Sequence, residues 1–118
     1  MQEKLRNKLY KKYPVLRTML IPGIDCDDGW YSLLDEYLGK IIEVCPDVRF
    51  DQIKSKFASL RIYIGGNNEA FALSDQAGDL SEKICELCGN EGEVFNNYGW
   101  LWAICPECKV KLVNYDKE

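Results

Sequence analysis

The chain has 118 residues, of which 47% are hydrophobic and 29% are charged, and its formal net charge is −4. This balance is typical of a globular protein and excludes a disordered chain, and the length suits one domain with one core. No apolar run approaches the roughly 20 residues of a membrane-spanning helix, and the N-terminus lacks the apolar stretch of a signal peptide. We therefore expect a single cytoplasmic domain over residues 1–118 that does not enter a membrane.

Charge is distributed unevenly along the chain. Residues 1–64 carry 11 Lys or Arg and 9 Asp or Glu, whereas residues 65–118 carry 4 and 10. An acidic surface on the second half would repel bare nucleic acid and favour basic partners, while the first half keeps a mild basic character. An ordinary solvated surface explains the same charges.

The first predicted element is a short amphipathic helix in EKLRNKLYKK, where Leu5 and Leu9 are four residues apart. This helix should end before Pro14. The segment VLRTMLIPGIDCDDG that follows predicts a turn-rich connector, because Pro22 and Gly23 prevent a long helix.

The strongest predicted helix covers about residues 28–45, with Asp27 or Asp28 as its cap and Pro46 directly after its end. A helix of this length, about 25 Å, would hold Cys26 and Cys45 too far apart for a disulfide. We expect both as thiols in or near the core. The apolar face of this helix consists of Trp30, Leu33, Leu34, Tyr37, Leu38, Ile41 and Ile42.

The segment DVRFDQIKSKFASLRIYIGG alternates twice between apolar and polar residues, which predicts a strand, a turn and a second strand. Ile53 and Phe57 are also spaced as one helical turn, and the pattern leaves both alternatives open. A third helix is expected to follow, with Ala70, Leu73, Ala77, Leu80 and Ile84 as a narrow apolar stripe running into the first cysteine pair.

Four of the six cysteines form two C-x-x-C pairs, Cys85 with Cys88 and Cys105 with Cys108, separated by sixteen residues. Each pair turns two thiolates toward one point, as a tetrahedral metal site requires. Between the pairs, NNYG is flanked by EGEVFN and WLWAI and predicts a hairpin turn that brings them together. We interpret residues 85–108 as a zinc-ribbon submodule that holds one structural Zn²⁺ ion.

Two other uses of these cysteines are open at this point. A rubredoxin-like iron centre takes the same four thiolates, and six cysteines in a small chain are also compatible with a disulfide framework. A reducing cytosol argues against disulfides. The fold class that results is α+β, with helices packed on a small antiparallel sheet or hairpin and a C-terminal zinc-ribbon hairpin.

The residue content argues against an enzyme. The chain contains no histidine, which removes most acid–base, nucleophilic and catalytic zinc sites. Zinc bound by four cysteines has no open position for water, so its role would be structural. The remaining candidates for acid–base chemistry are carboxylates, Asp25, Asp27 and Asp28 together with Asp35 and Glu36 on the following helix. A helix cap and favourable negative charge near the helix N-terminus explain them more simply. No phosphate-binding loop or nucleophile motif is present in the sequence.

Two groups of residues are candidates for contact with a partner. Lys54, Lys56 and Arg61 could form a basic face for RNA, although strand alternation alone also explains them. Trp100 and Trp102 share one face of an extended strand, where they either cover the hairpin against the core or form an interaction surface.

Four segments, CDDGWYSLL, FDQIKSKFASLRIYIGG, CELCGNEG and GWLWAICPEC, resemble a set of small proteins of phage genomes and bacterial prophages. The resemblance runs from about residue 26 to 108. The chain departs from these relatives at Ala58, where they tend to have glycine, and at Cys108, where they can have histidine. The resemblance implies a phage or prophage context and a four-cysteine zinc ribbon.

Small acidic phage proteins without catalytic groups often act by occupying a surface of a host machine, as inhibitors of CRISPR nucleases do. By this analogy we expect a non-enzymatic, zinc-stabilised protein-binding module, an anti-CRISPR-like inhibitor whose partner is a host protein or ribonucleoprotein such as a CRISPR effector. The alternative hypothesis is a nucleic-acid-binding zinc-ribbon accessory protein that contacts RNA.

Overall fold

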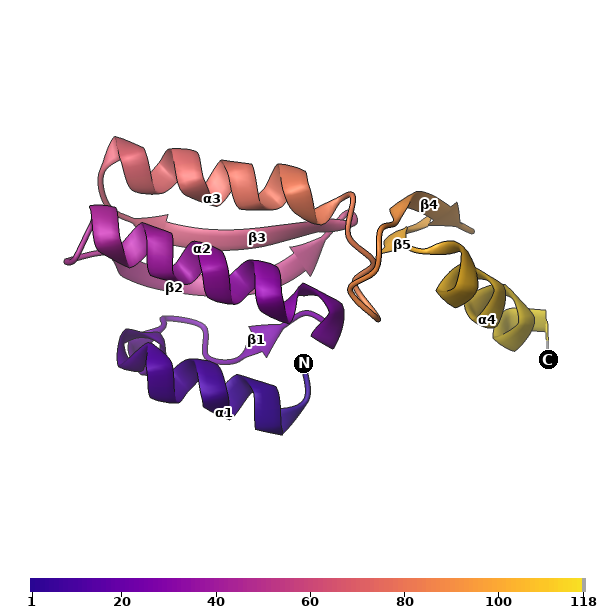
Figure 1. Cartoon of the computed structure of the whole chain (residues 1–118), viewed down its shortest axis with the longest axis horizontal. Coiled ribbons are helices and arrows are strands. Elements are labelled where there is room, and N and C mark those ends of the chain that lie inside the picture. Colours follow the sequence, from indigo (N-terminus) through magenta and orange to yellow (C-terminus); the bar gives the residue numbers. More distant parts are fainter. Residues whose placement is uncertain (118) are drawn as a thin grey trace.

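The computed structural model describes residues 1–117, with the side chains of residues 1–113 (Figure 1). It confirms the predicted α+β class, with helices packed on a small sheet and a separate C-terminal hairpin. Within residues 1–117 no helix is both long and apolar enough to span a membrane. The elements in chain order are α1 (Glu3–Lys12), the 3₁₀ helix η1 (Pro14–Thr18), β1 (Ile24–Asp25), the 3₁₀ helix η2 (Asp28–Trp30), α2 (Tyr31–Val44), β2 (Arg49–Lys56), β3 (Ser59–Gly65), α3 (Asn68–Ser81), β4 (Glu93–Asn97), β5 (Trp100–Ile104) and α4 (Pro106–Lys117).

The main sheet has three strands in the order β1-β2-β3. Strands β2 and β3 form the predicted antiparallel hairpin, in which Ile53 pairs with Ile62. The helical alternative for Ile53 and Phe57 is therefore wrong. Strand β1 pairs in parallel with β2 through Ile24 and Ile53, both of them buried. The prediction of a connector without regular structure missed β1, because two residues are too short to show alternation.

The β2–β3 hairpin turns through Phe57 and Ala58, which both have left-handed backbone angles, φ 53° and φ 64°. A two-residue turn of this kind matches the twist of the strands but requires φ above zero at both positions, where Asn-Gly is preferred. Ala58 is buried, whereas the Phe57 side chain is 67% exposed. The hairpin thus carries a costly turn with an aromatic ring in solvent.

Helix α2 supplies the centre of the core. Its buried side chains are those that the apolar periodicity predicted, with Trp30 of η2 also fully buried. Helix α2 packs beside α3, and both lie over the sheet (Figure 1). Cys26 and Cys45 are buried thiols, as expected, and burial raises the pKa of Cys26 to about 12.

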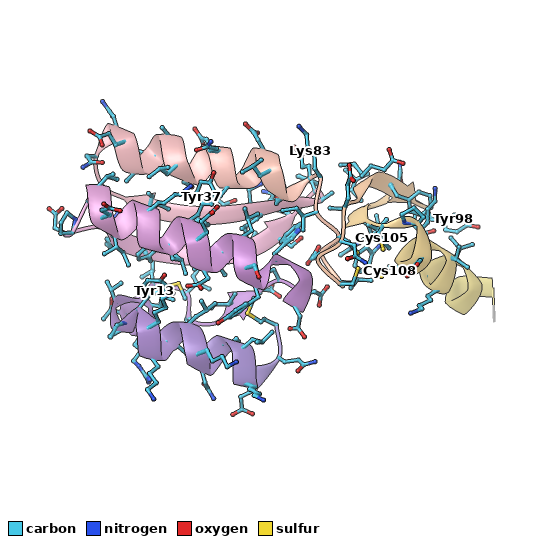
Figure 2. The ribbon with its side chains drawn as sticks, in the orientation of Figure 1. Tyr13, Tyr37, Lys83, Tyr98, Cys105 and Cys108 are labelled. Carbon is cyan, nitrogen blue, oxygen red and sulfur yellow. The ribbon has the colours of Figure 1, made fainter. Side chains whose placement is uncertain are left out.

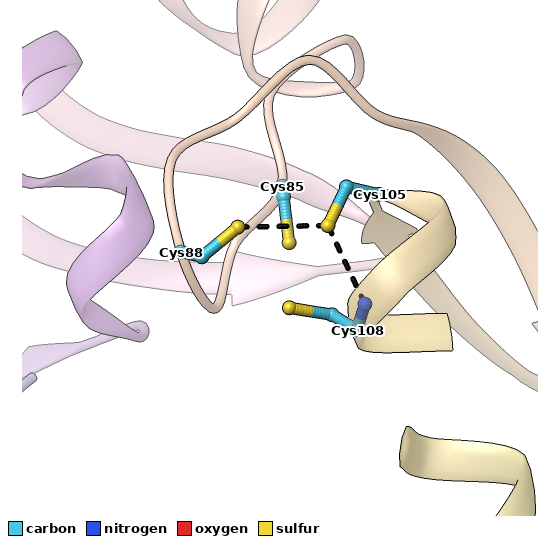
Figure 3. Close-up of side chains that lie close together, drawn as sticks. All are labelled: Cys85, Cys88, Cys105 and Cys108. Carbon is cyan, nitrogen blue, oxygen red and sulfur yellow. Dashed lines mark hydrogen bonds between the residues drawn. The ribbon is translucent and has the colours of Figure 1, made fainter. Parts of the chain in front are cut away.

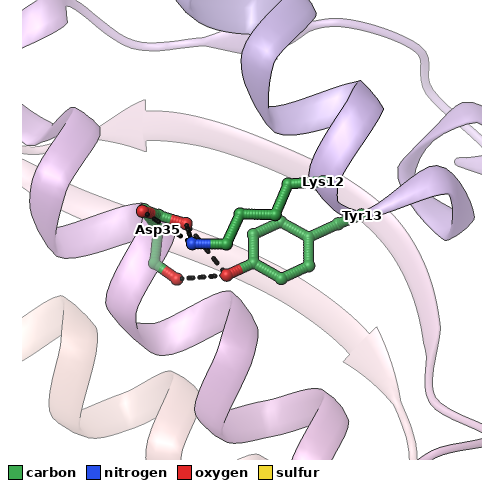
Figure 4. A network of polar contacts seen from close by, with 3 residues as sticks. All are labelled: Lys12, Tyr13 and Asp35. Atoms are coloured by element: carbon green, nitrogen blue, oxygen red, sulfur yellow. Dashed lines mark hydrogen bonds and ion pairs between the residues drawn. The ribbon is translucent and has the colours of Figure 1, made fainter.

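Helix α1 is tied to α2 by a polar cluster at its C-terminal end (Figure 4). The Tyr13 hydroxyl lies 2.9 Å from both the backbone carbonyl and a carboxylate oxygen of Asp35, and Lys12 Nζ lies 3.0 Å from the same carboxylate. Burial, followed by the bond to Asp35, raises the pKa of Tyr13. Figure 2 shows Tyr13 between α1 and α2.

The predicted caps of the second helix are not formed. Neither Asp27 nor Asp28 makes a side-chain capping bond there. The Asp28 carboxylate instead accepts the backbone N–H of Gln2 at 2.8 Å and so holds the start of α1. A tertiary contact has replaced the local one.

Helix α3 covers the outer edge of strand β3. Ser81 Oγ accepts the backbone N–H of Leu60 at 2.8 Å and donates to the Gly78 carbonyl at 2.6 Å, while Ser74 Oγ donates to the Ile62 carbonyl at 2.6 Å. The helix ends at Ser81, short of Ile84, and Leu80 of its predicted apolar stripe is 37% exposed. The apolar stripe of α3 is narrow because serine hydroxyls of this helix form hydrogen bonds to backbone groups at the edge of β3. Without these bonds, that edge would be open to pairing with another strand.

Replacing Ser81 by alanine should lower the free energy of unfolding by about 1–3 kcal/mol, because the buried N–H of Leu60 loses its acceptor. Urea denaturation followed by circular dichroism measures this. The exposed Ser32 on α2 is the matched control, and its change to alanine should shift stability by no more than about 0.5 kcal/mol. Equal losses in the two variants would contradict this role of Ser81.

Candidate metal centre

The four predicted ligands meet at one point beyond the end of α3 (Figure 3). Their sulfur atoms all lie within 4.8 Å of one another, and Cys88 Sγ is 3.5 Å from Cys105 Sγ. A zinc ion with four thiolates at about 2.3 Å places the sulfurs about 3.8 Å apart. The cluster of Cys85, Cys88, Cys105 and Cys108 therefore fits a single tetrahedral metal ion.

The first knuckle runs from Cys85 to Asn90 as a tight turn. The backbone N–H of Gly89 donates to the Cys85 carbonyl at 2.9 Å, and the N–H of Cys85 donates to the Asn90 carbonyl at 2.7 Å. Gly89 has φ 86°, which a residue with a Cβ rarely adopts. Gly89 therefore allows the left-handed turn that closes this knuckle.

The second knuckle is the first turn of helix α4. The N–H of Lys109 donates to the Cys105 carbonyl at 2.9 Å, and the N–H of Cys108 points to Cys105 Sγ at 3.5 Å. The sequence analysis missed α4, although proline at the first position of a helix, here Pro106, is a recognised start signal. The short apolar pattern after Cys108 was too weak to indicate a helix.

The spacer between the knuckles forms the predicted hairpin. Strands β4 and β5 are antiparallel, with Val94 opposite Ala103, and they turn through Tyr98 and Gly99 at φ 53° and φ 89°. An isolated bridge between Ile84 and Glu91 closes the base of the ribbon. Figure 2 shows Tyr98 pointing away from the body of the protein, and its side chain is 96% exposed.

The thiols of the cluster affect one another's ionisation. The backbone N–H of Cys108 stabilises the thiolate of Cys105 and lowers its pKa to about 7, whereas burial and the neighbouring sulfurs raise the pKa of Cys108. Four sulfurs this close together cannot all ionise unless a cation lies between them. The donor set therefore suits a thiophilic cation, and a four-sulfur tetrahedron is typical of zinc or iron.

The ribbon is joined to the body through residues 84–86. Trp30 Nε1 donates to the Ile84 carbonyl at 2.9 Å, and the N–H of Gly29 donates to the Glu86 carbonyl at 2.7 Å. The Glu86 carboxylate, which is 6% exposed, accepts the N–H of Asp27 at 3.2 Å and the Ser55 hydroxyl at 3.1 Å. The sequence analysis missed Glu86, because an acidic residue between two metal ligands has no periodicity that predicts burial.

The predicted partner contacts lie in two different places. Lys54 pairs directly opposite Arg61 on the side of the sheet away from the buried isoleucines, and Lys56 is exposed at the end of β2. Trp100 is 70% exposed, and Trp102 packs on the small apolar cluster of the ribbon. Of the two groups, Lys56, Trp100 and Trp102 come together on the lining of one cleft, whereas Lys54 and Arg61 are not part of that lining.

The two tryptophans do not cover the hairpin against the main core. That contact is made from the opposite face of β5 by Ala103, which is fully buried, and by Leu101, which packs beside it. Trp100 is therefore left to solvent near the tip of the ribbon.

A scan against protein-family models, a search of curated proteins and a search of solved structures all find no match to this chain. The fold and the cluster by themselves define the class of protein. It is an α+β protein with a ribbon at its C-terminal end whose four cysteines could hold a metal ion.

We expect the purified protein to hold one equivalent of zinc, without colour, and to lose the fold of residues 85–108 when a chelator removes it. Apparent metal-binding free energies of about 10 kcal/mol in small zinc modules explain this dependence. Elemental analysis and the near-ultraviolet circular dichroism of the ribbon tryptophans measure both effects.

The variants Cys88→Ser and Cys45→Ser separate metal binding from thiol content. Cys88→Ser should lose the metal, whereas Cys45→Ser should retain one equivalent, because Cys45 lies outside the four-cysteine cluster. The contact of Cys45 Sγ with the Asp47 carboxylate, at 3.4 Å, is one that a serine hydroxyl can replace. A red protein that contains iron, or fewer than six free thiols counted after metal removal in denaturant without a reductant and without air, would contradict the prediction of zinc.

Gly29→Ala should detach the ribbon from the body. A Cβ at this position would lie 2.1 Å from the Cys85 carbonyl oxygen and 2.5 Å from that of Glu86, so backbone atoms of the first knuckle would have to move. We expect a loss of about 3 kcal/mol in thermal unfolding.

Gly39→Ala is the control for this substitution. Its Cβ would meet only the Tyr13 side chain, 3.1 Å from the hydroxyl oxygen, and alanine favours the helix. A Gly29→Ala protein as stable as the Gly39→Ala protein would contradict the close contact.

Proposed function

We propose that this protein is a zinc-stabilised protein-binding module that acts by occupying a surface of its partner. Zinc with four cysteine ligands has no free coordination position at which to activate water or substrate. The chain also contains no histidine to act as a general base near neutral pH. If the metal is structural, the function lies in the surfaces of the ribbon and the body.

The observation that carries this proposal is the set of exposed aromatic side chains at the tips of both hairpins. Phe57 of the β2–β3 turn is 67% exposed, and Tyr98 and Trp100 of the ribbon are 96% and 70% exposed. Phe57 and Tyr98 both occupy left-handed turn positions, at φ 53°. Aromatic side chains are frequent anchors of protein interfaces.

The finer proposal is an anti-CRISPR-like inhibitor that acts in the cytoplasm of a bacterial host on a defence nuclease. The resemblance of residues 26–108 to small phage and prophage proteins supports this context. The excess of acidic residues in the second half also suits the positively charged channel in which a CRISPR effector holds its guide–target duplex. The partner would then be a host ribonucleoprotein, bound without turnover.

A nuclease protection assay tests this function. One equivalent of the protein should stop target cleavage by a purified CRISPR effector, and inhibition should follow stoichiometry rather than time. Protection that grows with time at substoichiometric amounts of the protein would indicate an enzyme. Absence of both binding and protection with every effector tested would contradict the proposed inhibitor function.

The variant Phe57→Asn separates binding from stability. Asparagine tolerates the left-handed turn better than phenylalanine, so the variant should be about as stable as the parent or up to about 1 kcal/mol more stable. We expect it to bind the partner more weakly because the ring is lost. Val110→Asn on α4, where Val110 is 58% exposed, is the control at a distant apolar site. Unchanged binding of Phe57→Asn would remove the hairpin tip from the interface.

The second candidate function is nucleic-acid binding by the outer face of the sheet. Lys54 and Arg61 are like charges directly opposite each other, an arrangement that costs stability unless an anion lies nearby. Asp25, next to Lys54 in the sheet, provides part of that compensation. Steep salt dependence of RNA binding, abolished by Lys54→Glu with Arg61→Glu, would favour this function over the first.

A further inference from the structure

A cleft lies between the ribbon and the body, and residues of both hairpin tips line it. Its volume is about 540 Å³, and it is lined by residues of the β1–α2 segment, the end of β2 and the start of β5. This size lies within the range of protein pockets that take small ligands. The cleft can therefore take a side chain or a short chain segment, but not a whole helix.

Three aromatic side chains line the cleft: Phe57 from the body, and Trp100 and Trp102 from the ribbon. The rings of Phe57 and Trp100 are largely exposed, so their faces are accessible to a ligand. Aromatic faces attract cations, and Lys56 Nζ already lies 5.5 Å from the centre of the Phe57 ring.

Three carboxylates, Asp25, Asp27 and Glu86, line the same cleft. The buried Glu86 carboxylate accepts the N–H of Asp27 on one oxygen and the Ser55 hydroxyl on the other, and each oxygen has the capacity to accept a further bond. The cations on the lining are Lys56 and the N-terminal ammonium of Met1, which donates to the Cys26 carbonyl. A zinc tetrathiolate next to Glu86 would add a formal charge of about −2. The surroundings of the cleft are thus negative and disfavour phosphate.

The turn at Phe57 supplies an independent observation. A left-handed phenylalanine costs on the order of 1 kcal/mol relative to the residues preferred there, yet its ring is mostly in solvent and adds little to the core. Strain of this kind with no folding benefit indicates a functional constraint. The constraint is explained if the ring serves as one wall of a binding site.

We propose that this cleft binds an arginine side chain of the partner protein, an inference that rests on the proposed protein-binding function. A guanidinium group stacks on aromatic faces and also pairs with carboxylates through its planar array of donors. The cleft brings aromatic side chains and carboxylates together around one space. An arginine-bearing surface segment of the partner is accordingly the occupant.

A titration by nuclear magnetic resonance of the metal-loaded full chain tests this inference. The probe is N-acetyl-arginine methylamide, and the matched neutral probe is the corresponding citrulline compound. Arginine should shift the indole N–H signals of Trp100 and Trp102, and citrulline should do so much less. Equal shifts with both probes, or larger shifts with inorganic phosphate, would overturn recognition of a cation.

Paired charge variants complete the test. Asp25→Asn with Asp27→Asn should weaken the arginine affinity by about tenfold, which corresponds to about 1.4 kcal/mol. Asp75→Asn with Asp79→Asn on the exposed side of α3 removes the same charge elsewhere and should leave the affinity unchanged. Equal weakening by the two pairs would overturn the site.

The remaining outcomes separate this inference from the proposed function. Stoichiometric nuclease protection without any shift by the arginine probe would overturn the inference and leave the function standing. Shifts of the same indole signals with protein concentration alone would mean that a second copy of the chain fills the cleft, and would also overturn it.

Discussion

The backbone contact between Gly29 and the first metal knuckle holds the two parts of the molecule together. Its hydrogen bond of 2.7 Å to the Glu86 carbonyl forms only because glycine leaves no Cβ against the Cys85 carbonyl. The indole of the next residue, Trp30, donates to the Ile84 carbonyl. Two adjacent residues directly before α2 therefore bind the ribbon. The position of the four cysteines is therefore tied directly to the main core.

The β2–β3 and β4–β5 hairpins have turns of the same backbone conformation. Each turns through two residues with φ above zero, but only the ribbon has a glycine at the second position, Gly99. Phe57 and Tyr98 hold equivalent first positions, and both direct an aromatic ring outward. Local preference and tertiary folding do not account for these rings, so they are the clearest sign in the molecule that a surface has been shaped for contact.

The sequence was most informative where a pattern was long or chemically specific. The periodicity of Leu34, Leu38 and Ile41 predicted α2 and its buried face, and the spacing of the cysteine pairs predicted the metal cluster. The β2–β3 and β4–β5 hairpins followed from alternation around turn residues. In each case the local pattern and the tertiary environment favour the same structure.

The features that the sequence did not predict depend on contacts between distant segments. Strand β1 exists because Ile24 pairs with Ile53, and Glu86 is buried because Asp27 and Ser55 approach it from the body. Asp28 looked like a helix cap but bonds to Gln2 instead. Short elements and buried polar bridges carry no repeat in the sequence, so only the assembled fold reveals them.

The six cysteines fall into two populations that differ in chemical accessibility. Cys26 and Cys45 are enclosed by the main core, and burial raises the pKa of Cys26 to about 12, so its thiolate is scarce near neutral pH. An alkylating reagent would reach these two thiols only through opening of the body, whereas the four sulfurs of the ribbon would be protected by a bound metal ion and reactive without one. Two labelling rates on one chain would thus report separately on how often the body opens and on how often the ribbon is free of metal.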